Sequence, residues 1–254
     1  MSARHISFLE TGRAQPSREM PLTPANVLDV PFRERNFLLL AASYVLFYDD
    51  TGLDHPRMAH MRSVVDATLK ANDPRSAIAH DRHWNIVMAN EAFARFLTVT
   101  LGKKPPGLEP LQVAAHPRLN LLRRIFDLNG LRRKIVNWEP IAKWLLNEAY
   151  RRLAWAREET LRTLIAEILS YVDVPSRWRK PDLEAPHQLI VPIGLNLNGV
   201  VARMFSTVTA VASPHDVTPQ ELHVEIFYAA NAESEKALHA CEKRTSARPK
   251  QLLE

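Results

Sequence analysis

Few residues of this chain have the types and spacing that catalysis or metal binding requires. The sequence contains no G-x-S-x-G, G-x-G-x-x-G, H-E-x-x-H or Walker phosphate-binding motif. Its ten histidines are scattered, and its single cysteine, Cys241, has no second thiol for zinc and no histidine arranged to activate it. Asp81 and His83 could form an acid–base pair, but surface turns commonly carry such residues. We therefore expect no enzyme, no metal site and no cofactor.

Length and composition limit the class of protein further. The chain has 254 residues, of which 46% are hydrophobic and 24% charged, which suits one large or two small folded domains. Its longest apolar run, residues 37–47, is too short to cross a bilayer, and no hydrophobic signal region follows Met1. A single cysteine allows no internal disulfide. These features predict a soluble, cytoplasmic protein.

Positive charge is concentrated in the middle of the chain. The net charge is +5, and residues 118–180 alone hold fourteen basic and seven acidic side chains. Such a segment either attracts an anionic partner over a long range or simply solvates the outer faces of amphipathic helices. The pattern leaves both interpretations open, and solvation is the simpler one.

The hydrophobic pattern predicts an α+β fold in which helices cover one face of an antiparallel sheet. Helical spacing is found at residues 2–11, 33–47, 56–71, 91–97, 117–129, 138–154 and 157–172. Residues 77–88 read as a hairpin, residues 102–107 as a loop, and strands are expected at 187–195, 200–212 and 223–230. Asn196 to Gly199 forms a suitable hairpin turn, because Asn and Gly tolerate a positive φ. The basic end of the chain, residues 236–254, is expected to be a disordered tail.

The alternation in the strand at residues 200–212 indicates which side of the sheet faces the interior. One face carries the smaller and more apolar side chains, namely Val200, Ala202, Met204, Ser206, Val208 and Ala210. We place this face inward, where small side chains would leave room for a ligand.

The first residues resemble the second half of a helix-turn-helix of the Cro/repressor (XRE) type. The resemblance rests on SARHISFLETGRAQPS at residues 2–17, with Ile6 packing inward, the run from Leu9 to Gly12, and Pro16. It implies that Arg13 contacts a phosphate and that four side chains face DNA bases, Ala3, Arg4, His5 and Ser7. Arg and His donate readily to base edges and phosphates in a groove that admits a helix.

The remainder resembles the MmyB-like regulators. The matching stretches lie at residues 28–44, 51–58, 79–97, 130–146 and 205–230. The resemblance implies a helix-turn-helix region with connecting helices over residues 1–75 and a PAS-like ligand-binding domain over residues 76–235. It also implies a pocket for a fatty-acid-like small molecule, and homodimers that bind operator DNA.

Three departures from the family pattern concern the DNA-binding region. Met1 stands just before the recognition helix, so the helix-turn-helix is expected to be truncated. Pro21 and Pro24 are expected to break the next helix, at about 3 kcal/mol for each interior proline. Ser43 and Leu46 stand where the family commonly has Gly and Pro. We therefore expect weak DNA binding, and a stand-alone lipid-binding module or a dimerisation partner without an operator is an alternative.

Candidate pocket residues come from the expected sheet and the helices that cover it: Trp84, Phe93, Trp138, Ala202, Met204 and Val208. Trp84 suits either ligand stacking or core packing. Asn90 and Asn137 suit helix N-caps better than ligand contacts. Arg132, Arg133 and Arg203 could pair with a ligand carboxylate, although each also suits a solvated surface.

Overall fold

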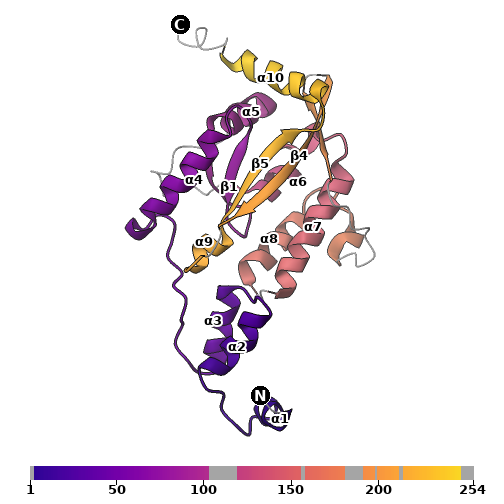
Figure 1. The fold of residues 1–254 in the computed structure, drawn as a ribbon. Coiled ribbons are helices and arrows are strands. Elements are labelled where there is room, and N and C mark those ends of the chain that lie inside the picture. Colours follow the sequence, from indigo (N-terminus) through magenta and orange to yellow (C-terminus); the bar gives the residue numbers. More distant parts are fainter. Residues whose placement is uncertain are drawn as a thin grey trace. The chain divides into compact units, whose positions relative to one another are not determined.

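The structure, a computed structural model, describes residues 3–102, 119–155, 158–180, 191–197, 199–211 and 214–246. The chain divides into two compact units (Figure 1). The first comprises Met1–Ala59 together with Val211–Glu221, and the second comprises His60–Ala210 together with Leu222–Glu254. The predicted α+β class is confirmed, with a helical N-terminal region and a second unit built on a sheet.

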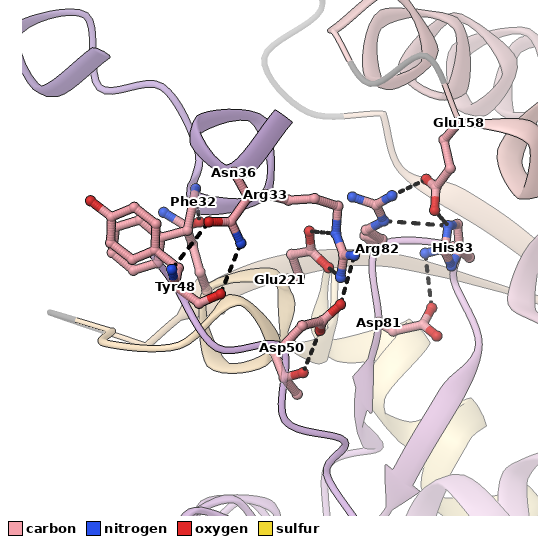
Figure 2. Close-up of polar contacts among 12 residues, drawn as sticks. Phe32, Arg33, Asn36, Tyr48, Asp50, Asp81, Arg82, His83, Glu158 and Glu221 are labelled. Carbon is pink, nitrogen blue, oxygen red and sulfur yellow. Dashed lines mark hydrogen bonds and ion pairs between the residues drawn. The ribbon is translucent and has the colours of Figure 1, made fainter. Parts of the chain in front are cut away.

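The first unit is helical. Its elements are α1 (Ala3–Glu10), α2 (Glu19–Val27), α3 (Phe32–Ala41), the 3-10 turn η1 (Pro56–Met58) and α9 (Val217–Glu221). Arg33 joins segments that are distant in sequence (Figure 2), because its Nη1 lies 2.7 Å from Oδ2 of Asp50 and its Nε lies 2.8 Å from Oε1 of Glu221. Helix α1 lies within the predicted residues 2–11, and Gly12, with φ of 70°, follows its end.

Two predictions for this unit are wrong. The helix expected at residues 33–47 ends at Ala41, because Ser43 adopts a φ of 64° and Asn36 Oδ1 accepts hydrogen bonds from the backbone N–H groups of Phe47 and Tyr48. The helix that Pro21 and Pro24 were expected to break forms as α2. Pro21 lies in its first turn, where a backbone N–H has no intrahelical partner in any case, so only Pro24 lies at an interior position.

The second unit contains the sheet and the helices that pack on it. Its helices are α4 (Ala59–Ala71), α5 (Glu91–Leu101), α6 (Leu121–Phe126), α7 (Trp138–Trp155), α8 (Glu159–Leu169) and α10 (Ala232–Ser246), with 3-10 turns η2 (Arg132–Lys134) and η3 (Ser176–Arg179). Helices α7 and α8 lie side by side, and α10 packs against β4 and α5 (Figure 1).

The strands are β1 (Ala77–His80), β2 (Ile86–Ala89), β3 (Ile193–Leu197), β4 (Val200–Ala210) and β5 (His223–Ala229). They form one antiparallel sheet in the order β2-β1-β5-β4-β3. Gly199, with φ of 93°, turns β3 into β4, so the predicted hairpin is confirmed. The register sets Val208 opposite Glu225, and Glu225 opposite Ile78. These cross-strand rows decide which side chains share the interior face.

Several element boundaries differ from the prediction. Helices α6 and α8 are shorter than the patterns at 117–129 and 157–172, and β3 begins at Ile193 rather than at residue 187. Most of the loop expected at 102–107 lies outside the described residues, as do residues 181–190. Helix α10 begins after Asn231, whose Oδ1 accepts the N–H of Ser234, and it continues to Ser246, where a disordered tail was expected from residue 236.

The core lies between the sheet and helices α5 to α8. Ile78, Leu97, Leu122, Phe126 and Ile168 are almost completely buried there. Asn90 caps α5 as predicted, since its Oδ1 accepts the N–H of Phe93 at 3.0 Å, and the same oxygen accepts the N–H of Ala77 in β1. This one side chain therefore ties the helix to the sheet.

Candidate functional site

The second unit contains a cavity of about 440 Å³, partly open to solvent, between the sheet and helices α5, α6 and α7. Most of its wall is apolar, including Phe93 and Phe96 of α5, Ile141 and Leu145 of α7, Met204 of β4 and Phe227 of β5. Its volume falls within the range of small-molecule sites, which are concave and mostly apolar with a few polar groups. The rest of the wall is polar and is formed mainly by His80, Glu148, Arg152, Ser206 and Glu225.

Helical and strand periodicity place these side chains on the cavity wall. On α7, Ile141, Leu145, Glu148 and Arg152 follow one another at spacings of four, three and four, so they share one face of the helix. On β4, Met204, Ser206 and Val208 alternate toward the cavity, as do Glu225 and Phe227 on β5. The charged members of these runs form the polar part of the wall.

Arg152 is the cation of the polar wall. Its Nε donates to Oε1 of Glu148 at 3.3 Å, and its Nη1 donates to the backbone carbonyl of Arg82 at 3.0 Å. Its guanidinium carbon lies 4.0 Å from the centroid of the Trp84 ring. Burial lowers the pKa of Arg152, with the nearby carboxylate of Glu148 acting in the opposite direction. No described residue accepts a hydrogen bond from Nη2, so this guanidinium can still bind an anion.

Three further titratable side chains lie beside Arg152 on one face of β1 and β5. His80 is almost fully buried, and its Nε2 lies 3.8 Å from Oε2 of Glu225. The ring of His223 lies 5.4 Å from that of His80. Burial lowers the pKa of His80 and lowers that of His223 to about 4, while burial raises the pKa of Glu225. His80 and Glu225 line the cavity, and burial disfavours the charged form of each.

A second polar cluster holds the turn between β1 and β2 (Figure 2). Nε2 of His83 lies 2.8 Å from Oε1 of Glu158, and Arg82 forms an ion pair with the same carboxylate. Burial alone would raise the pKa of Glu158, but hydrogen bonds from His83 and Arg82 lower it to about 2. Asp81 Oδ1 accepts the N–H of His83 and of Asn85, so Asp81 stabilises the turn while the His83 ring pairs with Glu158.

The structure brings four of the six candidate pocket residues together and separates two. Trp84, Phe93, Met204 and Val208 line the cavity. Ala202 does not line the cavity; it is fully buried in the core, opposite Leu195 in the strand register. Trp138 does not line it either, because its Nε1 donates to the Ile125 carbonyl and its ring packs against Phe126 and Trp178.

The candidate head-group residues lie elsewhere. Arg132 donates to the Val172 carbonyl and stacks 3.9 Å from the centroid of Trp138, while Arg133 and Arg203 are exposed. Asn137 is not a helix cap, as its Oδ1 accepts the N–H of Gly194 and its Nδ2 donates to the Pro192 carbonyl. The residues that sequence reasoning missed are Arg152, Glu148, His80 and Glu225. The detectable signal was on α7, where Glu148 and Arg152 interrupt an otherwise apolar stripe.

The residues assigned to DNA lie on or just after α1. Ala3, Arg4, Ser7 and Arg13 are exposed, and the side chain of His5 lies outside the described part of the chain. The guanidinium carbon of Arg4 lies 5.4 Å from the Phe8 ring centroid. The exposed positions are accessible to a partner.

Neither a metal site nor a membrane span is found in the described ranges. There, no three His, Cys, Asp or Glu side chains gather closely enough to hold an ion. Likewise, none of the helices described has both the length and the apolar character needed to cross a bilayer.

One family of known proteins matches the part of the chain that forms the second unit. The model of a family described as the MmyB-like transcription regulator ligand binding domain matches residues 61–240, which is more than half of the chain. The match begins where the second unit begins, and it includes all the side chains of the cavity wall. No curated protein matches the chain.

Proposed function

Because this chain belongs to the MmyB-like transcription regulators, whose matched domain binds a ligand, we propose that its cavity senses a fatty-acid-like molecule. The proposed ligand is a medium-to-long-chain carboxylic acid. Its chain lies among the apolar side chains of the wall, and its carboxylate pairs with Arg152. A regulator of this kind is a binding protein, so the proposal includes no catalytic step.

The observation that carries this proposal is the amphipathic character of one cavity. An acyl chain gains about 0.8 kcal/mol for each CH₂ group that it buries, and this wall offers aromatic and aliphatic contacts from helices α5, α6 and α7 and strands β3, β4 and β5. A carboxylate cannot be buried without a partner. Arg152 supplies that partner at the polar part of the same cavity, so one molecule can satisfy both regions.

The neighbours of Arg152 hold it ready for a carboxylate. Glu148, the Arg82 carbonyl and the Trp84 ring fix three sides of the guanidinium and leave the Nη2 edge for the ligand. A pre-organised cation loses less side-chain entropy on binding than a mobile one.

Native mass spectrometry of the purified chain, combined with thermal-shift titration, tests the proposal. Decanoic and tetradecanoic acid should bind and raise the melting temperature, since a ligand that binds only the folded state stabilises it. Their methyl esters keep the chain and lose the negative charge, so they should stabilise the protein less. A protein that carries no acid and gains no stability from any of them would refute the proposed ligand class.

We further propose that α1 is the helix that meets DNA, in a homodimer. Ala3, Arg4, His5 and Ser7 would face bases and Arg13 a phosphate. The proposed affinity is weak and without sequence preference, because α1 is a short helix and α2, which follows it, contains an interior proline. Fluorescence anisotropy with duplexes of different sequence tests this: similar affinities that fall together as salt rises support it, and one tightly bound sequence refutes it.

A further inference from the structure

The positions of His80 and Glu225 indicate that the ligand carries a second polar group in addition to its carboxylate. Nδ1 of His80 lies 2.8 Å from the backbone carbonyl oxygen of Asp81. A carbonyl oxygen only accepts, so the ring proton must reside on Nδ1. Nε2 of the neutral ring is then a hydrogen-bond acceptor, and it faces Oε2 of Glu225.

The His80–Glu225 pair has unused hydrogen-bonding capacity at the cavity wall. The two atoms lie 3.8 Å apart, which is too long for a direct hydrogen bond. The Ser206 hydroxyl bonds to the Glu225 carboxyl group, and Arg152 interacts with it electrostatically. Both His80 and Glu225 line the cavity, and their side chains are only 3% and 13% exposed. Buried polar groups of this kind need partners.

One hydroxyl group can satisfy both residues at once. An oxygen placed at an ordinary hydrogen-bond distance of about 2.8 Å from each of two atoms 3.8 Å apart forms a closed triangle with them. Such a hydroxyl donates its proton to Nε2 of His80 and accepts the proton of the Glu225 carboxyl group. Burial raises the pKa of this carboxyl group, against the smaller opposing effects of Ser206 and Arg152, and so acts in favour of the proton that this bond requires. An ammonium group fits less well, because the Arg152 cation is close by.

We propose that the preferred ligand is a hydroxy-substituted fatty acid whose hydroxyl group lies close to its carboxylate and is bound by His80 and Glu225. This inference rests on the proposed function, since Arg152 must hold the carboxylate for the hydroxyl to reach the pair. A plain fatty acid needs one polar anchor. The polar wall of this cavity offers two, on different elements, the second formed by β1 and β5.

Calorimetric titration of the full chain with three acids of equal length tests the proposal. We expect β-hydroxydecanoic acid to bind at least about tenfold more tightly than decanoic acid, as a hydrogen bond in a buried site allows. We expect ω-hydroxydecanoic acid to bind more weakly than decanoic acid, because its hydroxyl would enter the apolar part of the cavity. Equal affinities for decanoic and β-hydroxydecanoic acid would overturn the inference and leave the proposed function standing. No binding of any acid would overturn both.

Two glutamates of the cavity wall provide a matched pair of variants. In Glu225→Leu a side chain of similar size can neither donate to the ligand hydroxyl nor accept from it, so the preference for the hydroxy acid should fall to within about twofold while decanoic acid still binds. Glu148→Leu removes a carboxylate of the same wall that bonds to Arg152 and lies outside the His80–Glu225 pair, so the preference should persist. A preference that survives in Glu225→Leu would overturn the assignment. The comparison of acids on the unaltered protein does not depend on either variant.

Discussion

The guanidinium of Arg152 stacks on the ring of Trp84, with its central carbon 4.0 Å from the ring centroid. Trp84 has a φ of 61°, a conformation that bulky residues seldom adopt. The turn imposes it, because the Trp84 N–H donates to the Asp81 carbonyl and the Trp84 carbonyl accepts the N–H of Leu121. The β1–β2 turn therefore positions the proposed carboxylate anchor of a different element, α7.

Arg152→Gln should weaken the binding of a fatty acid by about tenfold to a hundredfold, because a charge-assisted hydrogen bond contributes roughly 1.5–3 kcal/mol. Isothermal titration with decanoic acid measures the change. Arg151→Gln is the matched control, because Arg151 directly precedes Arg152, also pairs with Glu148 and does not line the cavity. Equal losses in the two variants would show a general charge effect rather than a contact with the carboxylate.

Ile141→Phe should fill part of the cavity and reduce ligand affinity, while the extra volume costs roughly 1–3 kcal/mol of folding stability. Ile141 is 5% exposed and lines the cavity. Ile165→Phe, on α8, adds the same volume at a residue that is 4% exposed and does not line it. Titration should show a loss for the first variant alone. Undiminished binding in Ile141→Phe would place the ligand elsewhere.

The sequence predicts most of the sheet, because successive side chains of a strand point to opposite faces and turn residues mark where each strand ends. The hairpin from Ala77 to Ala89 and the strands β4 and β5 lie where the alternation predicts them. Helix ends are less predictable when the cause is distant. Asn36 ends α3 by bonding the N–H groups of Phe47 and Tyr48, and no local pattern at residues 41–47 shows this.

The sequence pattern predicts which face of β4 points inward, but not which residues of that face line the cavity. Alternation places Ala202, Met204 and Val208 on one side of β4, but it cannot show that Met204 and Val208 line the cavity while Ala202 is packed in the core. The same holds for Arg152 of α7. Its spacing in the sequence indicates that it lies on the inner face of the helix, but only the structure shows that it contacts Trp84.

Asn90→Ala should lower the free energy of unfolding by about 2 kcal/mol, because it removes a helix cap and leaves buried N–H groups without a partner. Asn90 is 5% exposed and accepts from both Phe93 and Ala77, while its Nδ2 donates to the Arg75 carbonyl at 2.7 Å. Urea denaturation measures the change. Asn129→Ala, at an exposed position, should have an effect within about 0.5 kcal/mol of zero. A similarly small effect at Asn90 would contradict the structural role given to it.

Stability should also fall as the pH is lowered, because His223 is held in its neutral form. Burial, followed by the charges of His80 and Arg152, lowers its pKa to about 4, and its Nδ1 is buried without a hydrogen-bond partner among the described residues. The unfolded chain takes up this proton near the ordinary pKa of about 6.5. The unfolded state therefore binds more protons between these two values, and the stability that His223 contributes above pH 6.5 is lost progressively toward pH 4.

His223→Gln should reduce this loss, because glutamine has no proton to take up in that range. Urea denaturation of the wild type and the variant at about pH 7 and about pH 5 gives the difference directly. His80, whose pKa is also lowered by burial, acts in the same direction, and Glu225, whose pKa is raised, acts in the opposite one, so the two proteins are compared at each pH. His60→Gln, at an exposed position of α4, should keep the wild-type pH dependence. If His223→Gln lost stability on acidification as steeply as the wild type, another group would have to account for the proton uptake.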